Sequence, residues 1–189
     1  MNSFALNYIQ VLRRNLLEID IDRIHRISEL ILNVHRNGNQ VFIMGNGGSA
    51  STASHFACDL TKCSPPNGGR RLRVMSLNDN TPILTAWAND VGYDAVFREQ
   101  LTNYLLPDDV VIAITASGNS PNVLNAVEYA RTVGAISIGL IGFTGGKLQH
   151  MVDECVIVDN DNYGQVEDIH MMLSHMIAQY VGKMMQDGG

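Results

Sequence analysis

The alternation of short apolar runs with helical segments is the feature that most constrains how this chain of 189 residues can fold. Continuous runs rich in Val and Ile are typical of strands buried on both faces of a parallel sheet, whereas half-exposed strands alternate polar and apolar residues. Five such runs occur after residue 39. They predict strands at residues 40–44, 72–77, 110–115, 135–141 and 154–158.

Helical spacing of apolar residues fills the intervals between these runs. It predicts helices at residues 49–63, 82–88, 95–105, 121–132 and 166–185. Parallel strands joined by right-handed helical crossovers give an α/β fold, here a doubly wound, five-stranded αβα sandwich. The Pro- and Gly-rich residues 64–69 predict an inert surface loop, with a lid over a site as the alternative.

Two further helices are predicted ahead of the sheet, the second ending at Asn37-Gly38. The first repeats apolar residues at helical spacing, too many for an arm bathed in solvent: Phe4, Ile9, Leu12 and Leu16. We therefore predict a single domain over residues 1–189. It comprises an N-terminal helical arm for oligomerisation (1–38) and an α/β core (39–189).

Composition excludes several classes of protein. The formal charge of −6 argues against a nucleic-acid partner, and the one basic cluster, Arg70 to Arg73, is interpreted as a solvated loop end. No apolar run approaches the roughly 18 residues of a membrane span, and the first residues lack a signal-peptide pattern. Three cysteines are too few for a disulfide framework, so we predict reduced thiols in a cytoplasmic protein without a membrane partner.

A glycine loop, Gly45-Asn-Gly-Gly-Ser49, follows the first predicted strand. Its glycines allow backbone N–H groups to approach an anion, and the next helix adds the positive end of its dipole. The loop lacks the third glycine of a dinucleotide fingerprint and the Gly-Lys-Ser/Thr ending of a P-loop. It therefore indicates an anion site that is neither for dinucleotides nor for nucleoside triphosphates.

A serine loop, Thr115-Ala-Ser-Gly-Asn-Ser-Pro121, follows the third strand. Asn119 or Ser120 can cap the next helix, with Pro121 in its first turn. Ser117 and Ser120 offer hydroxyls beside the free N–H groups of that helix, which suits a monophosphate. A plain turn with a helix cap is the alternative for this loop alone, but two such loops on βα units favour a phosphorylated ligand.

Two histidine–carboxylate pairs are candidates for acid/base or metal chemistry. His55 and Asp59 are four residues apart and share one helix face. Glu167 and His175 are eight apart, or roughly 80° around the axis of the last predicted helix, so both can point into one pocket. His170 lies roughly 140° from His175 and cannot share its task. The sequence pattern leaves open whether the two pairs meet.

The chain resembles the SIS (sugar isomerase) domain family, and within it the phosphoheptose isomerases. The resemblance rests on the two loops, on His55-Phe-Ala57, Asn89-Asp90 and Gly145-Gly146, and on Glu167 to His175, and it spans almost the whole chain. It implies an SIS-type fold and an aldose–ketose isomerisation through an enediol(ate), from sedoheptulose 7-phosphate to glycero-manno-heptose 7-phosphate. It also implies a homotetramer of dihedral symmetry with active sites between subunits.

The resemblance also implies roles for individual residues. A divalent metal, typically zinc, would be bound by His55, Asp59, Glu167 and His175. Asp59 would act as the base, with Glu167 as the alternate, and His175 as its acid/base partner. The substrate would be bound by Asn46, Gly47, Gly48, Ser49, Asp79, Asn80, Thr115, Ala116, Ser117, Ser120 and Glu167.

Three departures from the family pattern bear on these roles. The family usually has glutamate where this chain has Asp59, glutamine where it has Glu167, and an aspartate at the position of Gly164 or Gln165. The shorter Asp59 could fall short of a substrate proton by more than about 1 Å, and Glu167 could restore the carboxylate. Two alternatives stay open: a non-catalytic relative that binds the bacterial replication initiator, and an isomerase or binding protein for another sugar phosphate.

Overall fold

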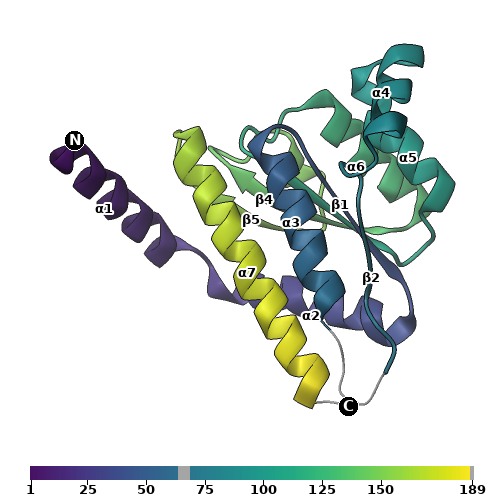
Figure 1. Cartoon of the computed structure of the whole chain (residues 1–189), viewed down its shortest axis with the longest axis horizontal. Helices are drawn as coiled ribbons and strands as arrows, with labels where there is room; N and C mark the ends of the chain where they lie inside the picture. Colours follow the sequence, from purple (N-terminus) through teal and green to yellow (C-terminus); the bar gives the residue numbers. More distant parts are fainter. Residues whose placement is uncertain (64–68, 188–189) are drawn as a thin grey trace.

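The computed structural model describes residues 1–63 and 69–187, so most of the predicted loop at 64–69 lies outside the described residues. Its centre is a five-stranded parallel sheet in the order β2-β1-β3-β4-β5 (Figure 1). The strands are β1 (Gln40–Gly45), β2 (Arg73–Ser76), β3 (Val110–Thr115), β4 (Ile136–Gly142) and β5 (Glu154–Val158). The prediction of a doubly wound α/β fold with two leading helices is confirmed.

Helices cover both faces of the sheet, because successive side chains of a strand point to opposite faces and both sets are apolar here. In β1, Val41 and Ile43 pack toward α2, α3 and α7, whereas Phe42 and Met44 pack toward α4, α5 and α6. The helices are α1 (Asn2–Glu18), α2 (Ile21–Asn37), α3 (Gly48–Lys62), α4 (Thr81–Asp90), α5 (Val96–Tyr104), α6 (Pro121–Val133) and α7 (Tyr163–Asp187).

The predicted elements agree with the structure apart from their ends. The second strand is shorter than predicted, and α7 begins three residues earlier, at Tyr163. Two short 3₁₀ helices, Tyr93–Ala95 and Leu148–His150, were not predicted. Among the residues that the structure describes, no helix combines the length and hydropathy needed to cross a membrane.

The strand order contains a switch point that the sequence pattern does not reveal. The chain passes from β1 to the edge strand β2 and then returns to place β3 on the other side of β1. In sheets of this order, ligands bind in the crevice beyond the carboxyl ends of the two central strands. Those strands are β1 and β3, so the glycine loop and the serine loop flank this crevice.

The first helix extends away from the sheet (Figure 1), and polar contacts anchor it to α7 and to the segment just before α7. The Tyr8 hydroxyl donates a hydrogen bond of 2.7 Å to Asp168, which raises the pKa of Tyr8 to about 12. Asn15 is buried and donates to the Asp159 carbonyl. The other side of α1 exposes large apolar side chains: Phe4, Leu6, Ile9 and Leu17.

Candidate functional site

The glycine loop is held from one side by Asn78. The Asn78 side chain accepts a hydrogen bond from the Gly45 N–H (3.1 Å) and donates one to the Gly45 carbonyl (2.9 Å). Gly47 then adopts a positive φ of 57° at the N-cap of α3, a conformation that favours glycine. No side chain caps this end of α3, so its first N–H groups remain available to an anion.

The carboxylate of Glu167 lies directly over Gly48, the first residue of α3. A Cβ atom built on Gly48 would overlap all three atoms of that carboxylate, so the side chain occupies space that only glycine leaves open. Glu167 is half-buried and comes from the first turns of α7. The structure therefore places one predicted catalytic carboxylate at the glycine loop, next to the buried Ser49.

The serine loop forms a compact turn on the other side of the switch point. Thr115 is buried, and its hydroxyl accepts from the Gly118 N–H at 3.3 Å. Gly118 has a positive φ of 64° and packs against the backbone of Gly145. Ser120 occupies the N-cap of α6, yet its side chain makes no capping hydrogen bond. The Ser120 hydroxyl is therefore free to contact a ligand. In the first turn of α6, Pro121 has no N–H and the Val123 N–H is bonded to Asn122 Oδ1, which leaves the Asn122 N–H for an anion.

A pair of asparagines joins the two loops. Asn46, predicted to bind substrate, donates to Asn122 Oδ1 at 2.9 Å, and Asn122 Nδ2 donates back to Asn46 Oδ1 at 2.9 Å. The Tyr93 hydroxyl also donates to Asn46 Oδ1, at 2.8 Å. Neither Asn122 nor Tyr93 was predicted as a site residue. Asparagine is favoured near the start of a helix, so no local pattern marked Asn122 as a site residue.

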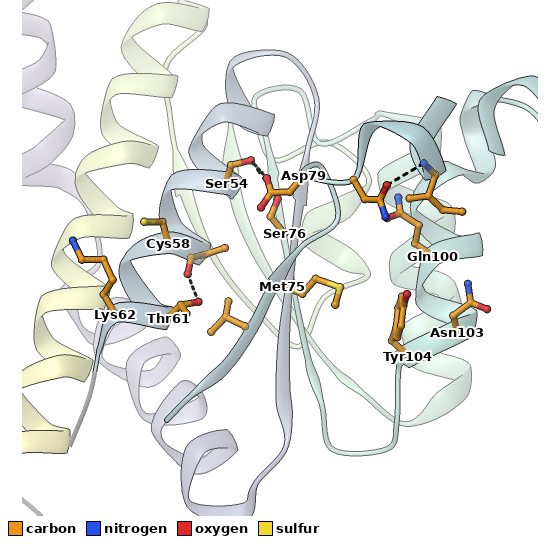
Figure 2. Close-up of a pocket in the computed structure, with 14 residues that line it drawn as sticks. Ser54, Cys58, Thr61, Lys62, Met75, Ser76, Asp79, Gln100, Asn103 and Tyr104 are labelled. Carbon is orange, nitrogen blue, oxygen red and sulfur yellow. Dashed lines mark hydrogen bonds between the residues drawn. The ribbon is translucent and has the colours of Figure 1, made fainter. Parts of the chain in front are cut away.

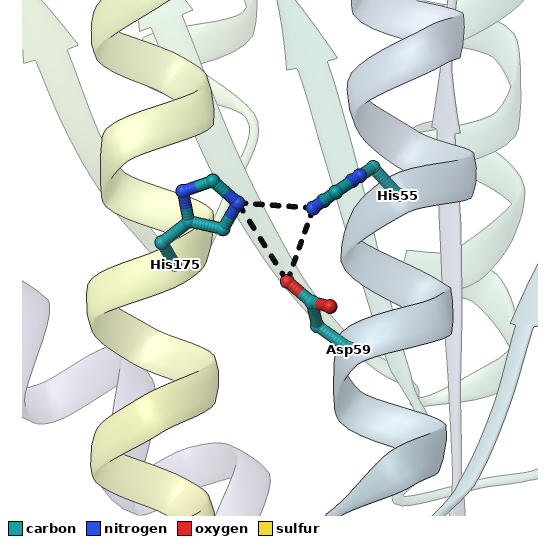
Figure 3. A group of neighbouring side chains, drawn as sticks. All are labelled: His55, Asp59 and His175. Carbon is teal, nitrogen blue, oxygen red and sulfur yellow. Dashed lines mark hydrogen bonds and ion pairs between the residues drawn. The ribbon is translucent and has the colours of Figure 1, made fainter.

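His55, Asp59 and His175 form a second cluster farther along α3 and α7, in which His55 is exposed and the other two are half-buried (Figure 3). Asp59 Oδ2 lies 3.2 Å from His55 Nε2 and 3.7 Å from His175 Nε2, and the two Nε2 atoms are 2.9 Å apart. One ligand atom from each residue thus lies within 4.8 Å of the others. Two imidazoles and a carboxylate match the three protein ligands that catalytic zinc sites commonly have.

Glu167, the fourth metal ligand that the resemblance implies, is not brought into this cluster. The angle between Glu167 and His175 around the helix predicts only that both can point into one pocket, and the shared metal is implied by the resemblance. Eight residues also rise roughly 12 Å along the axis, and Glu167 is directed at Gly48 instead. Helices α3 and α7 lie side by side (Figure 1). Glu167 lies beside Gly48 in their first turns, and His175 lies beside His55 farther along both helices. We call these two positions the two levels of the site.

Asp79 and Asn80, predicted to line the sugar, lie beyond the end of the edge strand β2. The Ser54 hydroxyl donates to Asp79, and the Asn80 side chain caps α4 by accepting from the Ile83 N–H at 3.2 Å. Both line a cavity of about 540 Å³ between α3, β2, α4 and α5 (Figure 2). The residues that line this cavity include neither loop nor the histidine cluster. Asp79 and Asn80 make these local contacts and directly follow Asn78, which holds Gly45 of the glycine loop; their role as substrate ligands stays a prediction.

His170 is the buried histidine of α7 and lies outside both levels. Its ring is fully buried, and this burial lowers the pKa of His170 from 6.5 to about 4. Burial disfavours the charged imidazolium, so the residue is neutral at physiological pH. This agrees with the expectation that His170 does not share the task of His175.

Comparison with known proteins finds phosphoheptose isomerases among the relatives of this chain. A family model described as the SIS domain matches residues 6–142. A probable phosphoheptose isomerase from Thermoplasma acidophilum is 35% identical over 177 residues, covering 94% of this chain and 97% of that protein. A phosphoheptose isomerase from Aliarcobacter butzleri is 37% identical over 158 residues, covering 84% and 83%.

Solved structures give the same similarity in three dimensions. A phosphoheptose isomerase from Francisella tularensis superposes with a TM-score of 0.89 at 28% identity, covering 96% of both chains. The phosphoheptose isomerase from Neisseria gonorrhoeae superposes with a TM-score of 0.86 at 30% identity, covering 95% of both chains. The similarity therefore extends over nearly the whole chain, the N-terminal helices included.

Proposed function

The chain belongs to the SIS domain family of sugar isomerases, and from this premise we propose that it converts sedoheptulose 7-phosphate to glycero-manno-heptose 7-phosphate. The observation that carries the proposal is the carboxylate of Glu167 at the glycine loop, across the switch point from a serine loop suited to phosphate. One loop holds the phosphate and the other presents the reacting carbons to a base.

Phosphate binding is assigned to the serine loop. The hydroxyls of Ser117 and Ser120 and the N-terminus of the 13-residue α6 can surround a dianion without a lysine. Contacts to the phosphate are remote from the reacting carbons. Their binding energy therefore holds the sugar in position for the proton transfer.

Proton transfer is assigned to Glu167. It accepts the proton from the carbon next to the carbonyl, which gives the enediol(ate), and a proton returns to the neighbouring carbon. Asp59 and His175 were the acid/base pair expected from the resemblance. Because both point into the His55 cluster, we assign them to metal binding and Glu167, the alternate base, to the proton.

The histidine cluster fits one zinc ion, held by His55, Asp59 and His175. Bound there, the metal would supply a Lewis acid for the carbonyl and enediolate oxygens. The residues themselves hold this geometry through the i, i+4 pair His55–Asp59 on α3 and the position of His175 on α7.

We also propose a homotetramer of dihedral symmetry that works in the cytoplasm. The exposed Phe4, Leu6 and Ile9 of α1 support assembly, because a large apolar face on a small domain is normally covered. Free thiols at Cys58, Cys63 and Cys155 support a reducing compartment.

The non-catalytic alternative, a relative that binds the replication initiator, is not favoured. The similar proteins described above are named as isomerases, and this chain keeps a carboxylate at Asp59. Conversion of a different sugar phosphate is the second candidate, favoured by the changes at Asp59 and Glu167, which alter the reacting end of the site.

The experiment is turnover of sedoheptulose 7-phosphate by the purified protein, followed by NMR of the sugar, with metal content measured by mass spectrometry. We expect conversion, loss of activity on chelation and recovery with zinc. Asp59→Asn should lower the metal content, and turnover should fall with it, because Asp59 is assigned as a metal ligand. A protein that converts no ketose phosphate, with or without zinc, would contradict the proposal.

A further inference from the structure

The asparagine pair Asn46–Asn122 bridges the switch point and can hold the two loops in position for the reaction. Asn46 follows β1 directly and Asn122 is the second residue of α6, so the pair ties the glycine loop to the helix that ends the serine loop. The proposed mechanism requires these two segments to be held at a fixed separation. Asn122 is 1% exposed, which shields the pair from competing water.

The orientation of both amides is determined by their other partners. Reversing both amides would preserve the reciprocal pair, but the Val123 N–H donates to Asn122 Oδ1 at 3.0 Å and requires an oxygen there. The Asn122 oxygen therefore faces the Asn46 NH₂ group, and the Asn46 oxygen faces the Asn122 NH₂ group. The Tyr93 hydroxyl supplies a second donor to the Asn46 oxygen.

Donor and acceptor capacity then decides what Asn46 can do for a ligand. An amide oxygen has two lone pairs and an NH₂ group has two hydrogens. The Asn46 oxygen already accepts from Asn122 and Tyr93, and its NH₂ group donates to Asn122. Its oxygen is thus committed to the protein, and one N–H remains for the substrate. The side chain is placed chiefly to fix the loop.

We propose that Asn122, acting through Asn46 and secured by Tyr93, is a positioning residue that sets the separation between the phosphate site and the reacting carbons. This inference rests on the proposed isomerase function. The serine loop keeps its own contacts without the pair, since Gly118 bonds to Thr115. Loss of the pair would therefore leave phosphate binding intact and misplace the glycine loop.

The kinetic test compares Asn122→Ala, Asn46→Ala and the double variant. A displacement of about 1 Å at a reacting centre can cost about 10²-fold, so we expect kcat to fall about 10- to 100-fold. The inhibition constant for inorganic phosphate should stay within about twofold of the parent. The double variant should be no worse than either single variant, because both remove the same pair.

Asn125→Ala is the matched control. Asn125 lies on the same helix and donates to the Asp94 carbonyl at 3.0 Å, near Tyr93, but it does not contact the glycine loop. It should retain the parent kcat. An Asn122→Ala protein with the parent kcat would overturn the proposal. So would a double variant whose loss equals the product of the single losses, since Asn46 would then act on the substrate independently.

A second measurement does not depend on turnover. Amide hydrogen exchange should accelerate in a peptide spanning residues 45–50 of Asn122→Ala and stay unchanged in Asn125→Ala, with equal melting temperatures. If the parent protein proves inactive on heptose phosphate, the proposed function fails. The exchange measurement still tests whether Asn122 holds the glycine loop in place. Unchanged exchange in Asn122→Ala would overturn the positioning role.

Discussion

Substituting Gly48 by alanine tests whether the position of Glu167 matters for the reaction. The new Cβ would overlap the Glu167 carboxylate, and ordinary contact distances of about 3.5 Å require a displacement on the order of 1 Å. The obstacle is the end of a flexible side chain, and the φ of Gly48 is not positive, so the fold can accommodate the methyl group. The substitution therefore displaces the Glu167 carboxylate and leaves the backbone in place.

The expected result follows from the size of that displacement. Moving a base by about 1 Å costs on the order of 10²-fold in kcat. Glu167→Gln keeps the shape but removes the base, and should cost about 10²- to 10⁴-fold without lowering zinc content. Steady-state kinetics with sedoheptulose 7-phosphate and thermal unfolding of each variant provide the measurements. We expect melting temperatures close to that of the parent.

The double variant separates a displaced base from a blocked substrate. If Gly48→Ala acts through Glu167, adding it to Glu167→Gln lowers kcat little further. If the methyl group obstructs the sugar directly, KM rises and the loss persists in the double variant. A Gly48→Ala enzyme with the parent kcat would refute the assignment of Glu167 as the base. Loss of metal from the Glu167→Gln enzyme would instead indicate that Glu167 is a metal ligand.

Three further predictions concern the phosphate site, acid stability and assembly. Ser120→Ala should weaken the binding of inorganic phosphate, measured by its competition with the substrate, by about 1.5–3 kcal/mol. The melting temperature should stay unchanged, because the Ser120 hydroxyl does not cap α6. The pKa of His170 falls from 6.5 to about 4 on folding. The contribution of neutral His170 to the free energy of unfolding is therefore present above pH 6.5 and decreases by about 3 kcal/mol as the pH falls to 4. Urea unfolding of the parent and of His170→Gln should show this difference in pH dependence. Parallel pH profiles would contradict it. Replacing Phe4 and Ile9 by serine should lower the mass in light scattering from that of a tetramer, whereas a monomeric parent would exclude the assembly.

The fold could be predicted largely because its signals are local. Runs of Val and Ile, helix-period spacing and the Asn37-Gly38 stop each depend on neighbouring residues, and Gly38 does adopt the left-handed conformation with φ of 82°. The order of the strands depends on which edges pair over long separations. The sequence pattern gave no information on this, and hence none on the switch point between the two loops.

The candidate site was only partly predictable for a related reason. The spacing of His55 and Asp59 predicted that their side chains meet, and they do, because one helical turn determines their distance. The grouping of Glu167 with His175 considered the rotation around a helix and omitted the rise along it. Asn122 and Tyr93 were missed because their partner, Asn46, lies 76 and 47 residues away, and no local pattern encodes such a contact.

Helix α7 also determines how this protein can be attached to a surface. It has 25 residues and is therefore roughly 37 Å long, with Glu167 in its first turns and Asp187 at its far end. An electrode or resin coupled at the last turn of α7 would leave both loops facing the solution. Coupling through α1 would instead occupy the apolar face proposed for assembly. A biosensor for phosphorylated sugars should therefore be immobilised through the last turn of α7.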